Sequence, residues 1–98
     1  MNVLSFKLVT GEEIVARVNS TEEDQSGKKI SYLVSSAQVL QFQPTREGRM
    51  ALALVPWTLS NPDLDDIRLP AVHVVTSFPP SADVEREYIR QTSKIALA

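Results

Sequence analysis

Polar and apolar side chains alternate along most of this sequence, in short runs that end at glycine, proline or polar clusters. A period of two is typical of β-strands that bury one face. Residues 3–9 begin the pattern, and residues 13–18 resume it after Gly11, which tolerates the positive backbone angles of a tight turn. We therefore expect the chain to begin with an antiparallel hairpin.

Three further runs predict strands at residues 30–43, 50–59 and 67–78. In the first of them the apolar face switches sides after Ser35, which indicates a bulge or a sharp bend at that point. Residues 19–29, which precede it, contain no apolar side chain and predict a solvated hairpin loop. The strand at 50–59 is apolar on both faces, so it needs a neighbour on each side.

A helix is expected at the C-terminal end of the chain, over about residues 82–95. Pro79 and Pro80 stop the last strand, and Ser81 is a good N-cap with acidic residues in the turn that follows. Five strands and one helix in 98 residues leave room for a single core, so residues 1–98 are expected to form one mainly β domain.

Composition excludes several classes of protein. The net charge of -2 provides no global positive field for nucleic acid, so any such site has to be local. The chain has no cysteine, which excludes disulfides and thiolate metal sites and fits a reducing compartment, and we expect a cytoplasmic protein. No apolar run approaches the roughly 20 residues that span a bilayer, so no membrane partner is expected.

Candidate chemical groups are few. His73 is the only histidine, which excludes a catalytic triad or a two-histidine metal site within one chain; it reads as a packed or interface residue, with a ligand role as the alternative. Trp57 reads as a core or interface residue, or as a platform for a base. Asp63, Asp65 and Asp66 read as a solvated acidic turn rather than a cation site. We expect no enzyme, no metal and no cofactor.

Some stretches resemble Sm-like proteins of the LSm and Hfq type. The sequence LVTGEEIVARV at residues 8–18 resembles the opening hairpin of that family, and Ile67 with Arg68 resembles the start of its Ile-Arg-Gly signature, although Leu69 stands in place of the glycine. The stretches ALVPW and LPAVHVV also look like those of Sm-like proteins carried by marine viruses.

The resemblance implies a small, strongly bent, five-stranded antiparallel barrel, here with a C-terminal helix. It also implies a homo-oligomeric ring of about five to eight subunits, in which the fourth strand of one copy pairs with the fifth strand of the next. The apolar character of both strands fits this independently, since bare edges of this kind invite aggregation. The interface residues would be Met50, Leu52, Leu54, Val72, Val74 and Thr76.

Two functions follow from such a ring. In the first, the loops at residues 19–29 and 58–66 lie nearest the pore and bind single-stranded RNA, and the contacts are Asn19, Lys28, Lys29 and Arg68. In the second, the ring is a scaffold for protein partners, and the aspartates of the acidic turn keep RNA out of the pore.

Overall fold

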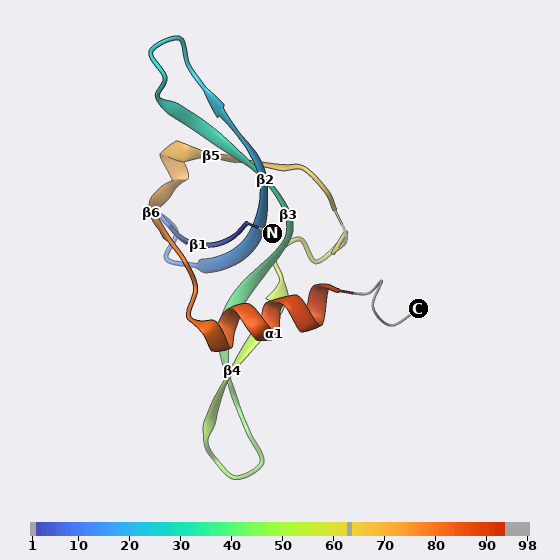
Figure 1. Cartoon of the computed structure of the whole chain (residues 1–98). Coiled ribbons are helices and arrows are strands. Elements are labelled where there is room, and N and C mark those ends of the chain that lie inside the picture. The colour runs from blue at the N-terminus through green and yellow to red at the C-terminus, as the bar shows by residue number, and fades with distance from the viewer. Residues whose placement is uncertain (1, 63, 94–98) are drawn as a thin grey trace.

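The fold is one antiparallel sheet covered by one helix (Figure 1). The computed structural model describes residues 2–62 and 64–93. Its elements are β1 (Val3–Leu8), β2 (Glu13–Glu23), β3 (Lys29–Pro44), β4 (Met50–Pro56), β5 (Ile67–Pro70), the 3-10 helix η1 (Ala71–His73), β6 (Val74–Phe78) and α1 (Ala82–Thr92). The strand order is β4-β3-β2-β1-β6, and β5 also pairs with β3. The prediction of a mainly β fold with a C-terminal helix is confirmed.

The prediction of five strands in a closed barrel is wrong, because the sheet has six strands and is open. The expected strand at 67–78 is two strands with different neighbours: β5 pairs with β3, and β6 pairs with β1. Pro70 ends β5, and the turn of η1 carries the chain from β3 across to β1. A proline donates no backbone hydrogen bond, so it favours such a break. The ends of the main sheet are β4 and β6.

The expected loop at residues 19–29 is also wrong over its first part, since β2 continues to Glu23 and the turn occupies residues 24–28. Backbone pairing with β3 continues through Thr21 opposite Tyr32, and polar side chains do not prevent it. The β2–β3 hairpin and the β3–β4 hairpin extend from opposite ends of the molecule (Figure 1). The helix was expected to end near residue 95, but α1 ends at Thr92. Residue 95 itself lies outside the described residues.

The bulge expected near Ser35 is confirmed, and it shapes the sheet. Val15 lies opposite Gln38 whereas Arg17 lies opposite Ser35, so β3 carries one residue more than β2 between these pairs. Ser36 takes a φ of 53°, a left-handed conformation that non-glycine residues rarely adopt. A bulge bends the strand and increases its twist. The first half of β3 consequently pairs with β5 and the second half with β4.

The curled sheet has a core on each face. The inner core consists of Phe6, Leu8, Ile14, Ala16, Val34, Ala37, Val39 and Leu69. On the outer face Tyr88 of α1 is fully buried against side chains of three strands, namely Val3, Val15 and Leu54. In residues 2–62 and 64–93, no helix has the length and hydropathy that crossing a membrane requires.

Candidate functional site

The four residues that the sequence suggested as RNA contacts lie on β2, β5, the β2–β3 turn and the start of β3, and two of them are bound to acidic side chains of the chain itself. Arg68 Nε donates to Glu22 Oε1 at 2.8 Å. Asn19 Nδ2 donates to Asp66 Oδ1 at 2.9 Å. The Ser31 hydroxyl and the Arg68 guanidinium hold the pKa of Glu22 below its usual value, so this carboxylate remains charged beside Arg68. Such pairing reduces the charge that Arg68 offers to a phosphate.

The other two, Lys28 and Lys29, line a hollow of about 300 Å³ that we call the lysine hollow. Lys29 Nζ lies 5.7 Å from the centroid of the Tyr32 ring, a cation–π contact that steadies the ammonium group. The other lining residues are Asp24, Ile30, Ala71 and Val72. Two lysines and three apolar side chains in one lining suit a phosphate with an adjacent apolar or aromatic group, although Asp24 opposes an anion.

The strands expected at the subunit interface are the two ends of the sheet. Met50 is 61% exposed, and Leu52 and Thr76 are exposed as well. Val72 is 81% exposed but lies in η1 rather than on β6, so its expected place on the last strand is wrong. Two residues of the predicted interface are already covered within the chain. Leu54 packs under the helix with Tyr88, and Val74 packs against the inner core.

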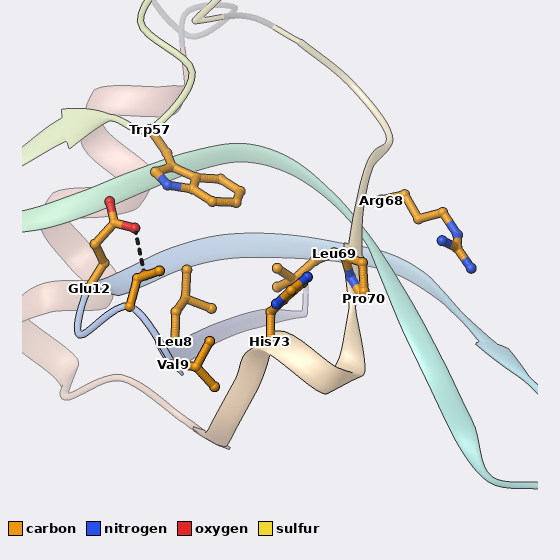
Figure 2. A pocket seen from close by; sticks show the side chains of 9 residues that line it. Leu8, Val9, Glu12, Trp57, Arg68, Leu69, Pro70 and His73 are labelled. Carbon is orange, nitrogen blue, oxygen red and sulfur yellow. Dashed lines mark hydrogen bonds between the residues drawn. The ribbon is translucent and has the colours of Figure 1, made fainter.

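A second hollow, of about 170 Å³, opens beside the β1–β2 turn and was not predicted from the sequence (Figure 2). We call it the tryptophan hollow. Trp57 lies on one side of it, and Leu8, Leu69 and His73 lie on the other. Trp57 is half-buried and packs against the inner core, as one of the two interpretations of this residue expected. His73 is exposed in the single chain, so it is not packed in the core, and its interpretation as an interface residue stays a prediction.

No model of a known protein family and no curated protein matches this chain. Its function therefore has to be inferred from the two hollows and the two ends of the sheet.

The backbone around the tryptophan hollow is fixed by hydrogen bonds. The Trp57 N–H donates to the Ala37 carbonyl at 2.9 Å, which ties this residue to β3. The Val9 N–H donates to the His73 carbonyl at 2.9 Å, which ties η1 to the end of β1. Gly11, with a φ of 97°, closes the β1–β2 turn that forms one wall. The hollow is thus built on sheet backbone and a tight turn rather than on a long loop.

Residues of η1 line both hollows. Ala71 and Val72 line the lysine hollow, and His73 lines the tryptophan hollow. The arrangement offers cationic and aromatic surfaces, which suit binding.

The site could be predicted only in part because its contacts join distant parts of the chain. Asn19 and Asp66 are 47 residues apart, and Glu22 and Arg68 are 46 residues apart. Trp57 and His73 come together only because η1 returns the chain to β1. The one signal available in the sequence was the lone tryptophan next to Pro56.

Proposed function

We propose that this chain is a non-enzymatic, Sm-like subunit that assembles edge to edge with copies of itself and binds single-stranded RNA on the assembled ring. The observation that carries the assembly is the open sheet with β4 at one end and β6 at the other. An end strand presents unpaired backbone N–H and C=O groups, which another strand can pair.

The side chains on these two strands support pairing between copies. Met50 and Leu52 are exposed on β4, and Val75 and Phe78 are exposed on β6. If β4 of one copy lies beside β6 of the next, the sheet continues and part of this apolar surface is removed from water. Because the two contacting strands differ, the contact is head-to-tail, and it closes into a ring when the rotation per subunit fits.

RNA binding is supported by the lysine hollow. One copy offers two lysines opposed by Asp24, which is a weak phosphate site. A ring repeats the hollow once per subunit, so a single strand that contacts several copies gains affinity by multivalency. Arg68, which lines the tryptophan hollow, is a further cation for the strand where phosphate competes with Glu22 for its guanidinium group.

A binding titration tests the RNA proposal. Fluorescence anisotropy of a labelled U-rich or A-rich oligonucleotide is measured at low salt with the wild-type chain and with the double variant Lys28→Ala/Lys29→Ala. We expect binding that weakens as salt rises, with a smaller salt slope and lower affinity in the double variant. The matched control is Arg46→Ala/Arg49→Ala, which removes the same charge from the turn of the β3–β4 hairpin, at the opposite end of the molecule (Figure 1).

A protein scaffold that takes no RNA is the second candidate. The pairs Arg68–Glu22 and Asn19–Asp66 favour it, because they occupy polar groups that RNA would otherwise contact. A ring that shows no RNA binding at low salt would support the scaffold and end the RNA proposal.

A further inference from the structure

The tryptophan hollow has a shape that selects flat ligands. Figure 2 shows the Trp57 indole on one side and Leu8, Leu69 and His73 on the other, so a planar group that enters between them contacts apolar or aromatic surface on both faces. The volume of about 170 Å³ lies below the range of roughly 300 to 1,000 Å³ that drug-sized ligands occupy. One ring system fits such a space, and a larger ligand does not.

The hollow is ready to bind without a large rearrangement. The backbone of the two residues with rings, Trp57 and His73, is held by hydrogen bonds of 2.9 Å. The Trp57 N–H donates to the Ala37 carbonyl, and the Val9 N–H donates to the His73 carbonyl. Preorganised groups lose little conformational freedom when a ligand binds. Trp57 is also half-buried against the inner core, which restricts its rotation.

The rim of the hollow is polar. Thr10 and Glu12 form one side, where the Thr10 hydroxyl donates to Glu12 Oε1 at 3.1 Å. Arg68 also lines the hollow, and Figure 2 shows its guanidinium directed away from Trp57. A carboxylate at the rim accepts hydrogen bonds from exocyclic amino groups. An apolar slot with a polar rim matches a heteroaromatic ring better than it matches an aliphatic side chain.

We propose that the tryptophan hollow binds one nucleobase of a single-stranded RNA, stacked on Trp57, while the lysine hollow, which η1 also lines, holds a neighbouring phosphate. This inference rests on the proposed RNA-binding function and gives that function a base-binding subsite. The lysines favour a nucleotide over an uncharged aromatic side chain from a partner protein, because the nucleotide also brings an anion to the lysine hollow.

Trp57 reports on its own ligand because it is the only tryptophan in the chain. Its fluorescence is followed while adenosine, uridine and short unlabelled oligonucleotides are added, at an excitation wavelength where the nucleosides absorb little. We expect saturable quenching by nucleoside alone and tighter quenching by the oligonucleotides. In His73→Ala the nucleoside should bind roughly fivefold or more weakly, since stacking surface is lost.

The matched control is Val72→Ala, which changes the preceding residue of η1, a residue that lines the lysine hollow and not the tryptophan hollow. It should leave nucleoside quenching unchanged. Lys28→Ala/Lys29→Ala should also leave nucleoside quenching unchanged while it weakens the oligonucleotides.

Three results would overturn the proposal. Oligonucleotide binding by anisotropy with no change in Trp57 fluorescence would leave RNA binding in place and remove the base subsite. Absence of both signals would end the two proposals together. A fluorescence change that follows protein concentration without any added nucleotide would instead assign the hollow to a second copy of the chain.

Discussion

Tyr88 is the residue that joins the helix to the sheet. Its ring is fully buried against Val3, Val15 and Leu54, and its hydroxyl donates to the Ser35 carbonyl at 3.2 Å, beside the bulge of β3. A buried hydroxyl costs free energy unless it is hydrogen-bonded, so the partner on Ser35 makes the burial possible. One side chain therefore links the helix, the outer core and the bend of the sheet.

Substitutions at Tyr88 separate these contributions. Tyr88→Phe keeps the ring and removes one hydrogen bond, so we expect a loss of about 1 kcal/mol in the free energy of unfolding. Tyr88→Ala also leaves a cavity and should cost about 3–5 kcal/mol. Urea denaturation measures both, and a Tyr88→Ala variant as stable as the wild type would show that α1 is not docked on the sheet.

The pH dependence of stability offers a separate check on the same residue. Burial raises the pKa of Tyr88 above its usual value near 10, and the positive charge of Arg17 opposes this shift. A raised pKa in the folded state gives a stabilisation that is fully present below about pH 10 and is lost as the pH rises through the folded value.

The free energy of unfolding should therefore fall more steeply above pH 10 in the wild type than in Tyr88→Phe. Equal slopes in denaturation series across this pH range would mean that the phenol ionises as readily in the folded chain as in the unfolded one.

At the scale of elements, the start of α1 is set by its cap. The backbone N–H of Val84 donates to Ser81 Oγ at 3.3 Å, and Asp83 and Glu85 follow in the first turn. Ser81→Ala should cost about 1 kcal/mol, because it leaves an N–H of the first turn without a partner. Ser81→Asp keeps a capping oxygen and should be nearly neutral. Thermal denaturation of both variants and the wild type measures these losses of stability. A Ser81→Ala variant as stable as Ser81→Asp would mean that the capping oxygen contributes nothing.

The elements divide clearly into those that the sequence predicts and those that it does not. Alternation identified β1, β4 and most of β3, and proline followed by serine identified the start of α1. Alternation failed for η1, because His73 and its valine neighbours keep a period of two in a segment that turns. It also failed at the far end of β2, where polar residues such as Ser20 and Thr21 pair through their backbone and provide no apolar signal.

At the scale of the whole molecule, the two hairpins carry different surfaces at opposite ends (Figure 1). The β2–β3 hairpin carries the lysine hollow, and the β3–β4 hairpin carries exposed apolar side chains, including Phe42, which is 70% exposed. In a head-to-tail ring, these apolar groups would lie next to the strand contact. Assembly and RNA binding would then use separate parts of one sheet.

A charge on β4 should weaken assembly without unfolding the subunit. Met50→Lys changes an exposed side chain, so the fold of one copy should tolerate it, whereas a subunit contact would bury the charge. We expect a lower oligomer mass in light scattering. Leu59→Lys is the matched control, because Leu59 is exposed and lies outside every strand. Equal masses for the two variants would mean that β4 is not a contact surface.

The most direct measurement of edge-to-edge assembly is the mass of the wild-type chain in solution, determined by size-exclusion chromatography with light scattering over a range of concentrations. Pairing of β4 with β6 in a closed ring predicts one discrete mass, a multiple of the 10.9 kDa chain mass, that changes little on dilution. A mass of 10.9 kDa at every concentration would contradict it.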